Sequence, residues 1–267
     1  MSSATCIMFS YWYGRMLISN EETSDFPIAA SSSAMDVDLG KNGGSPPAVR
    51  ETVDERKRLA FSRCVHRPIP VWKRAIDLTV SAMLLVILSP LLLAIAAFVW
   101  LTSGGPVLFK QVRLGVMGSE FVIYKFRTLR CCPDATSSHR HFVSTLSSSD
   151  IAIEKPDLSS RLISGGNFLR KSSLDELPQL VNILKGDMSL IGPRPDVLLW
   201  EDYQPHQLRR FEVLPGVTGL WQVSGKNRLT FQQMIDKDIE YVTRRSFMLD
   251  LKIALRTIPL LLFRDNA

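Results

Sequence analysis

Apolar positions concentrate between Leu78 and Leu101, in a stretch without a charged residue. This uncharged stretch of about 24 residues would extend roughly 36 Å as a helix, which is enough to cross the hydrocarbon core of a bilayer. No amphipathic pattern marks one of its faces for a protein partner, which argues against the alternative of a buried core helix. We therefore predict that residues 78–101 enter a membrane.

A serine–proline pair, Ser89 and Pro90, divides this segment near its middle. A proline inside a helix removes one backbone hydrogen bond and clashes with the preceding turn, so we expect a kink or a break there. Lysine and arginine, which favour the cytosolic side of a membrane, flank the segment at both ends. They are Arg56, Lys57, Arg58, Arg63, Arg67, Lys73 and Arg74 before it, and Lys110, Arg113, Lys125, Arg127 and Arg130 after it. Both flanks are thus predicted to be cytosolic, and a re-entrant helix satisfies both.

The remaining pattern divides the chain into further parts. From Ser19 to Glu55 the sequence is rich in Ser, Gly, Pro, Asp and Glu, and such a segment cannot bury enough surface to offset its ordering entropy. We predict a disordered tail over residues 1–55, either regulatory or inert, and a basic juxtamembrane segment over residues 56–77. Residues 102–263, after the re-entrant helix, are predicted to form one cytosolic domain.

Short alternating pieces at residues 107–111 and 121–126 predict two strands of that domain, separated by a loop that contains two glycines. Residues 130–160 are polar and are predicted to form a loop, whereas helical signals return over residues 173–185 and 229–263. The end of the last helix is expected either to lie at a membrane interface or to pack on the core. The predicted fold class is α/β and membrane-associated, with a re-entrant helix, a small sheet and several helices.

Charge and cysteine content narrow the possible partners. The net charge of +6 gathers largely beside the apolar segment, which suits contact with anionic lipid or phosphorylated ligands. The four cysteines have neither a Cys-x-x-Cys pair nor metal-binding spacing with the histidines, so zinc is not expected and a reducing compartment is. The aromatic-interleaved basic pattern of nucleic-acid-binding modules is absent, so no nucleic-acid partner is predicted.

An acidic pair, Asp175 and Glu176, stands at the start of the helix predicted over residues 173–185. Pro178 fits the first turn, which places the helix start near Ser173 to Asp175 and its end before Gly186. Both carboxylates then lie at the positive end of the helix. One alternative is structural, because Ser173 and Glu176 have the spacing of a capping box.

Cations around this pair indicate a second alternative, a site for a phosphorylated ligand. Arg170 and Lys171 precede the pair, and Arg194 follows it between two prolines that limit backbone freedom. Lys125 and Arg127 occupy alternating positions of a predicted strand and are expected to project from one face. Carboxylates with several cations suit diphosphate chemistry: an aspartate kept ionised by the helix end can attack phosphorus, while its neighbour holds Mg²⁺ against phosphate oxygens.

Three long motifs in the same region carry a family resemblance. They are YKFRTL at residues 124–129, FLRKSSLDELPQLVNILKGDMSLIGPRP at residues 168–195 and PGVTGLWQVSGKN at residues 215–227. In this order, behind an apolar segment with Ser-Pro at its centre, they closely resemble the bacterial sugar transferases, the monotopic phosphoglycosyl transferases. The resemblance covers roughly residues 72–259.

This resemblance implies a two-step enzyme mechanism on the cytosolic face of the bacterial cytoplasmic (inner) membrane. Asp175 attacks the β-phosphate of a UDP-sugar and expels UMP, and polyprenyl (undecaprenyl) phosphate then attacks the phosphosugar-enzyme. By the same resemblance Glu176 is the Mg²⁺ ligand and Ser89-Pro90 is the break of the re-entrant helix. The phosphate-binding cations are expected to be Lys125, Arg127, Arg170 and Arg194.

The resemblance also bears on pathway and substrate. It implies the start of exopolysaccharide, capsule or O-antigen synthesis, and the ending TGLWQVSGKN resembles the hexose 1-phosphate branch, which favours UDP-glucose or UDP-galactose. Leu129 replaces a methionine of the family pattern. Residues 159–163 keep only Arg161 of the family's Asp-Pro-Arg-x-Thr, a loop change that bears on substrate preference and local stability. Trp221 is expected either to stack on the base or to pack in the core. A non-catalytic membrane anchor or scaffold is the rival function, and homo-oligomerisation is left open.

Overall fold

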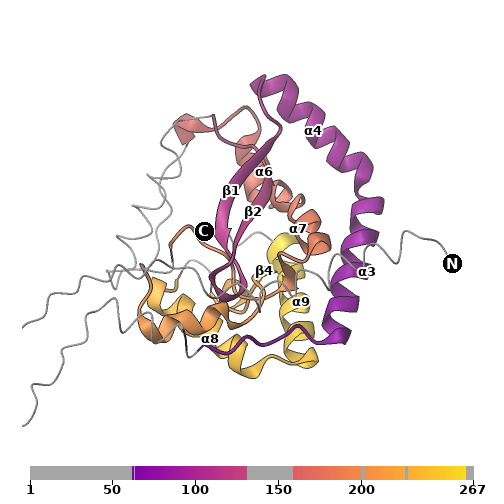
Figure 1. Cartoon of the computed structure of the whole chain (residues 1–267). Coiled ribbons are helices and arrows are strands. Elements are labelled where there is room, and N and C mark those ends of the chain that lie inside the picture. The colour runs from indigo at the N-terminus through magenta and orange to yellow at the C-terminus, as the bar shows by residue number, and fades with distance from the viewer. Residues whose placement is uncertain (1–61, 63, 131–158, 200–201, 226–227, 263–267) are drawn as a thin grey trace, which may run out of the picture. The chain divides into compact units, whose positions relative to one another are not determined.

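The computed structural model describes residues 62, 64–130, 159–199, 202–225 and 228–262 (Figure 1). The tail predicted over residues 1–55 lies outside this part of the chain, as does nearly all of the loop predicted over residues 130–160. The described helices are α3 (Val71–Ile87), α4 (Ser89–Ser103), α6 (Gly166–Lys171), α7 (Gln179–Lys185), α8 (Phe231–Arg244) and α9 (Phe247–Leu262). The strands are β1 (Leu108–Leu114), β2 (Glu120–Phe126), β3 (Ser189–Ile191) and β4 (Gly216–Thr218). Short 3₁₀ helices are η1 (Val116–Gly118), η2 (Ser159–Arg161), η3 (Leu174–Glu176), η5 (Pro205–Glu212) and η6 (Trp221–Val223).

The described part of the chain contains two small sheets, each of two strands, which confirms the predicted combination of helices with little sheet. β1 and β2 form an antiparallel hairpin, in which Leu108 pairs with Phe126 and Leu114 with Glu120. This hairpin contains both strands that the alternation predicted. The pair of β3 and β4 is parallel and was not predicted, because three-residue strands are too short to show a period.

Two glycines permit the close approach of β3 and β4. A Cβ atom on Gly216 would lie 2.0 Å from the backbone nitrogen of Gly192, so no larger residue fits there without moving the backbone. The sheet that results brings the Gly-Pro-Arg-Pro turn after β3 beside the Pro-Gly-Val-Thr segment that contains β4. Two of the motifs in the sequence therefore meet in space.

A bent pair of helices replaces the single apolar segment of the sequence. α3 and α4 meet at an angle of 64° across Leu88, and Pro90 occupies the first turn of α4, where its missing N–H leaves no helical bond unmade. The Ser89 hydroxyl donates to the carbonyl of Val86 at 2.8 Å. The break predicted at Ser89-Pro90 is confirmed. Among the described residues, no single helix is long and apolar enough to cross a bilayer, whereas α3 and α4 together meet that criterion of length and composition.

The helix before the break begins at Val71, earlier than the apolar segment, and it turns a polar face inward. Lys73, Asp77 and Ser81 recur every four residues, lie on one face and are buried. The opposite side exposes Trp72, Ile76, Met83, Val86 and Ile87. The expectation that no face is marked for a protein partner is therefore wrong for α3, because the polar residues that mark it lie mostly before Leu78.

This polar face completes the hydrogen bonding of β3. Asp77 Oδ1 accepts from the backbone N–H of Leu190 at 3.0 Å, and Lys73 Nζ donates to the carbonyl of Ile191 at 2.9 Å. Lys73 also forms a buried ion pair with Asp250 of α9, with an N–O distance of 2.7 Å. Side chains of α3 thus satisfy the edge of β3 that a third strand would otherwise cover.

The apolar core lies between these elements and holds the bent pair in place. Ile95 and Val99 of α4 are buried with Phe126, Ile163 and Leu169, next to β2 and α6. Leu84 and Leu85 of α3 pack against a second cluster, which consists of Phe121, Ile123, Leu180, Ile183 and Met188.

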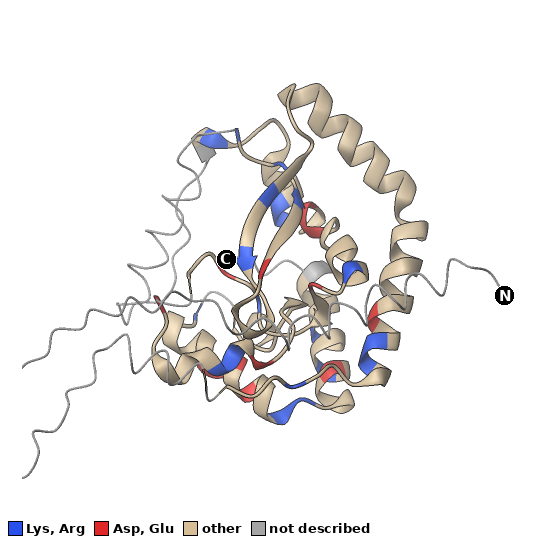
Figure 2. Ribbon diagram, in the orientation of Figure 1, with Lys and Arg blue, Asp and Glu red and all other residues tan. Residues whose placement is uncertain are grey.

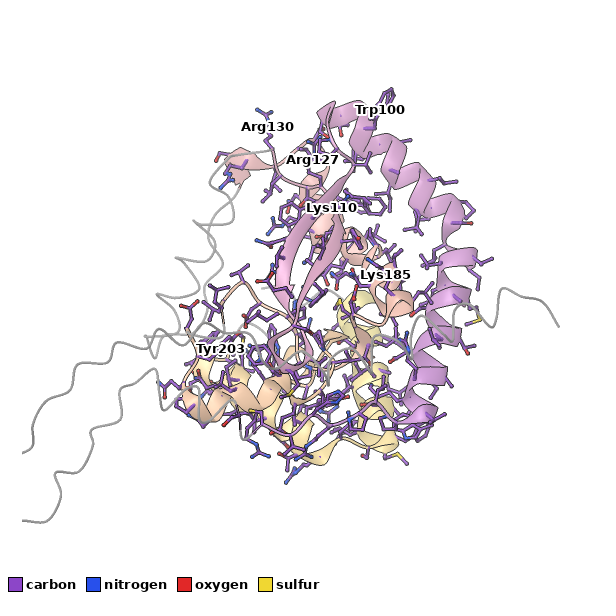
Figure 3. The ribbon with its side chains drawn as sticks, in the orientation of Figure 1. Trp100, Lys110, Arg127, Arg130, Lys185 and Tyr203 are labelled. Carbon is purple, nitrogen blue, oxygen red and sulfur yellow. The ribbon has the colours of Figure 1, made fainter. Side chains whose placement is uncertain are left out.

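The outer side of α4 remains apolar. Figure 2 shows no Lys, Arg, Asp or Glu along this helix, and Trp100, which is 62% exposed, projects from its end (Figure 3).

Candidate active site

The acidic pair lies in a single 3₁₀ turn, η3, immediately before α7. The N–H of Glu176 donates to the carbonyl of Ser173 at 3.1 Å, and that of Leu177 to Leu174 at 3.3 Å. α7 begins only at Gln179, so the start predicted near Ser173 to Asp175 is wrong. Because Pro178 has no N–H, a continuous α-helix through this turn would lack the backbone hydrogen bond that residue 178 would otherwise donate.

The capping-box alternative is also wrong. Ser173 adopts a left-handed conformation with φ of 55°, and its side chain makes no capping hydrogen bond. The carboxylate of Glu176 instead faces two cations. The end of α7 is confirmed, since Gly186 has φ of 93°, a left-handed conformation that favours glycine.

Glu176 is held by Lys125 and Arg194. Its Oε1 accepts from Lys125 Nζ at 2.9 Å, and its Oε2 accepts from Arg194 Nη1 at 3.0 Å. Arg194 Nη2 makes a second, shorter bond to Oε1, so the guanidinium contacts the carboxylate with both prongs of its fork. Arg194 Nη1 also donates to the carbonyl of Val217 at 3.0 Å. Residues from β2, η3 and the turn after β3 thus converge on one carboxylate.

Asn182 of α7 aligns β2 with this site, and sequence reasoning missed it. Its side-chain nitrogen donates to the carbonyl of Val122 at 2.7 Å, and its oxygen accepts from the N–H of Tyr124 at 3.1 Å. Asn182 is fully buried. The amide therefore fixes the strand that carries Lys125 to the helix that follows Glu176. Only the rarity of a buried asparagine in an apolar helix face could have indicated this role.

The two carboxylates differ in proton affinity. Burial alone would raise the pKa of Glu176, but the charges of Arg194 and Lys125 and their hydrogen bonds hold that pKa well below its usual range. Burial, followed by the negative charge of Glu176, raises the pKa of Asp175 to about 6, against the opposing charges of Lys125, Arg170 and Arg194. We expected the positive end of a helix to keep Asp175 ionised. That expectation is wrong, because η3 is only one turn long and the surroundings of Asp175 raise its pKa. Asp175 is the more basic carboxylate of the pair.

The other predicted cations lie in different places. Arg170, at the end of α6, is exposed and acts on Asp175 through its charge. Arg127 follows the last residue of β2, and its guanidinium donates to the carbonyl of Ser103 at 3.1 Å, at the end of α4 (Figure 3). The prediction that Arg127 and Lys125 share a face is not met by these contacts, since the strand ends between them. A phosphate-binding role for Arg127 stays a prediction.

The same residues can be tested for their fit to Mg²⁺. Among the described residues, no group of three or more His, Cys, Asp or Glu could hold a metal ion. Glu176 already accepts three hydrogen bonds, which leaves one lone pair on Oε2, and Asp175 lies beside it. Mg²⁺ is commonly bound by one or two carboxylates together with substrate phosphates and water. The acidic pair fits an ion of that kind, and not an ion enclosed by protein ligands alone.

This geometry defines a class of site: a carboxylate of raised pKa beside a cation-bound one, close to an exposed apolar helix. Comparison with known proteins specifies the class. The model of the bacterial sugar transferase family matches residues 69–264. The chain belongs to this family of transferases, as its motifs predicted.

Curated relatives show the same relationship. The chain is 41% identical over 205 residues to the UDP-glucose:undecaprenyl-phosphate glucose-1-phosphate transferase of Caulobacter vibrioides, over 73% of this chain and 71% of that protein. It is 36% identical to the exopolysaccharide production protein ExoY of Rhizobium meliloti, over 70% of this chain and 84% of that protein. It is 40% identical to the galactosyl transferase CpsE of Streptococcus agalactiae, over 62% of this chain and only 36% of that longer protein.

Proposed function

We propose that this enzyme transfers a sugar 1-phosphate, most simply glucose or galactose 1-phosphate, from a UDP-sugar to undecaprenyl phosphate. The product would begin an exopolysaccharide, capsule or O-antigen chain. The observation that carries the proposal is the acidic pair, in which Glu176 is fixed by Lys125 and Arg194 while Asp175 retains a basic carboxylate. The names of the relatives from Caulobacter vibrioides and Rhizobium meliloti support it.

The first step follows from the properties of Asp175. A carboxylate oxygen of Asp175 forms a bond to the β-phosphorus of the UDP-sugar, the bond from that phosphorus to the bridging oxygen breaks, and UMP leaves with the electron pair. Arg194 and Lys125 supply fixed positive charge where the phosphate oxygens gather negative charge. Mg²⁺ held by the acidic pair and the phosphate oxygens would add further charge neutralisation when bound.

The second step regenerates the carboxylate. A phosphate oxygen of undecaprenyl phosphate bonds to the same phosphorus, and the bond to Asp175 breaks, which yields undecaprenyl diphosphate sugar and free Asp175. Each step exchanges one P–O bond for another, so no oxidant or reductant is needed. The alternative of a scaffold has no use for a basic carboxylate beside a paired one.

The lipid acceptor is proposed to reach this site along the bent helix pair. We propose that α3 and α4 form a re-entrant membrane segment, with both ends on the cytosolic face of the bacterial cytoplasmic membrane. Leu91, Leu93, Trp100 and Leu101 of α4 are exposed and would contact acyl chains. Ile253 of α9 is buried in the core, whereas Met248, Leu251, Leu255 and Ile258 are exposed and would lie at the membrane interface in this proposal.

The decisive experiment measures UMP release by the purified full chain in detergent. UDP-glucose, UDP-galactose and an N-acetylated UDP-sugar are compared, with undecaprenyl phosphate and Mg²⁺ each present or omitted. Sustained release that needs the lipid phosphate supports transfer. The Asp175→Asn variant controls for contaminating hydrolases. Lack of release with every sugar would favour the scaffold.

A further inference from the structure

A buried polar cluster lies behind the turn that carries Arg194, away from Asp175. It consists of Asp196 in the turn after β3, Tyr203 before η5, Arg210 in η5 and Asp238 in α8. Only 4% of Arg210, 1% of Tyr203 and 1% of Asp238 are exposed. Tyr203 is labelled in Figure 3. The proposed reaction makes no use of these residues, so their arrangement calls for its own explanation.

Arg210 connects this cluster directly to Arg194. Its Nη2 donates to the backbone carbonyl of Arg194 at 2.6 Å and lies 2.8 Å from Asp238 Oδ2. Its Nη1 donates to the hydroxyl of Tyr203 at 2.8 Å and to Asp196. The Tyr203 hydroxyl donates in turn to Asp196, so the hydroxyl both accepts and donates. The guanidinium is therefore locked from several sides.

The bond to Arg194 acts at a point where the backbone has little other freedom. Pro193 and Pro195 fix their own φ angles, and Pro195 restricts the conformation of Arg194 before it. A carbonyl held by Arg210 fixes the peptide plane between Arg194 and Pro195, and with it the direction in which the Arg194 side chain leaves the backbone. Arg113 of β1 contacts the next carbonyl, that of Pro195, at 3.4 Å. The turn is thus fixed on its buried side, while Arg194 contacts Glu176 on the other.

Stability alone is a weak explanation for this cluster. Removing charges from water carries a large desolvation cost, and apolar residues of similar volume commonly serve a core equally well. Arg210 hydrogen-bonds the backbone carbonyl of Arg194, and the side chain of Arg194 binds Glu176. The guanidinium of Arg210 can fix the direction of the Arg194 side chain, which an apolar residue at position 210 would not do.

We propose that Arg210 is a positioning residue, which fixes the carbonyl of Arg194 so that the Arg194 guanidinium is aimed at Glu176 and at the diphosphate of the UDP-sugar. The proposal rests on the proposed function for its substrate. Asp196, Tyr203 and Asp238 hold Arg210 in turn. Arg210 does not touch the reacting atoms and acts only through Arg194.

A double-mutant cycle tests this coupling in the full chain. Arg210→Lys keeps the charge and loses the fork, so kcat/KM for the UDP-sugar should fall by about tenfold in the wild-type background but by less than about twofold when Arg194 is already lysine. Arg209→Lys is the matched control, since Arg209 is exposed at 44% and pairs with Glu212. Equal losses in both backgrounds, or activity of Arg210→Lys within about twofold of wild type, would overturn the proposal. If Arg210→Lys does not fold, Tyr203→Phe replaces it in the same cycle.

A second measurement does not depend on the reaction. The ¹⁵Nε–H resonance of Arg194, assigned by its loss in Arg194→Lys, should shift or broaden in Arg210→Lys or Tyr203→Phe and stay unchanged in Arg209→Lys. An unchanged resonance would overturn the positioning role even in an active enzyme. If the wild type releases no UMP from any sugar, the proposed function fails, while the resonance still decides whether Arg210 orients Arg194.

Discussion

The raised pKa of Asp175 predicts a specific pH dependence for the first chemical step. Burial and the charge of Glu176 raise this pKa from an ordinary 3.8 to about 6. Only the ionised carboxylate attacks phosphorus, so the rate should be constant above about pH 7 and fall below about pH 6. At about pH 5 a group with a pKa near 6 is ionised in about one molecule in ten, and the step should be about tenfold slower than its plateau. With an ordinary pKa, about nine-tenths would remain ionised and the loss would be negligible.

The assay is a single turnover without lipid acceptor. Rapid quenching and intact-protein mass spectrometry follow the phosphosugar adduct on Asp175 across about pH 4.5 to 8. A sample held at about pH 5 and returned to about pH 7.5 before mixing controls for unfolding, and Asp175→Asn controls for adducts elsewhere. A rate that stays flat down to about pH 5, with the adduct on Asp175, would refute the burial argument.

Three further predictions concern stability, binding and topology. Asp175→Asn should raise the melting temperature at about pH 8 more than at about pH 5. Because the folded-state pKa of Asp175 is raised, its contribution to stability is present below the unfolded-state pKa and is lost as the pH rises through about 6. The neutral amide of the Asp175→Asn variant does not ionise, so the variant avoids this loss, which is on the order of 1–3 kcal/mol. Arg194→Lys should lower kcat/KM by about tenfold or more, about 1.4 kcal/mol, because it loses the fork. In intact cells, single cysteines at the exposed Ser62 and Ser119, with native cysteines replaced, should both be protected from an impermeant reagent.

Each of these has a result that would contradict it. Equal melting temperatures for Asp175→Asn and wild type at both pH values would mean that the charge carries no folding cost. Activity of Arg194→Lys within about twofold of wild type would argue against a forked contact with the diphosphate, with Arg209→Lys as the reference. Labelling at Ser62 or Ser119 alone would establish a spanning segment.

Local rules allowed much of this fold to be predicted. The break at Ser89-Pro90 depends on the missing N–H of proline, and the β1–β2 hairpin depends on alternation over a few residues. Likewise, the acidic pair, Lys125 and Arg194 were identified by residue type and by motif. The structure brings all four into one site.

The remaining features depend on contacts that no local pattern encodes. Asp77 meets Leu190 across 113 positions of sequence, and Lys73 meets Ile191 across 118, so the inward polar face of α3 had no visible partner. Arg210 is one of several basic residues in a polar segment until β3 and η5 come together. Even η3 was hidden, since the spacing of Ser173 and Glu176 resembles an ordinary cap.

The polar side chains that α3 lends to β3 have a consequence for the modularity of the molecule. Cutting the chain after Ser103 to obtain a freely dissolved enzyme would strip the N–H of Leu190 of its acceptor and leave Asp250 without its lysine. The bared edge of β3 would then be open to pairing with other chains. The bent helix pair is therefore part of the fold, and not a membrane anchor that can be exchanged freely. Exchange of this segment between relatives should succeed only where Lys73 and Asp77 are transferred together with β3, the strand whose backbone they hydrogen-bond.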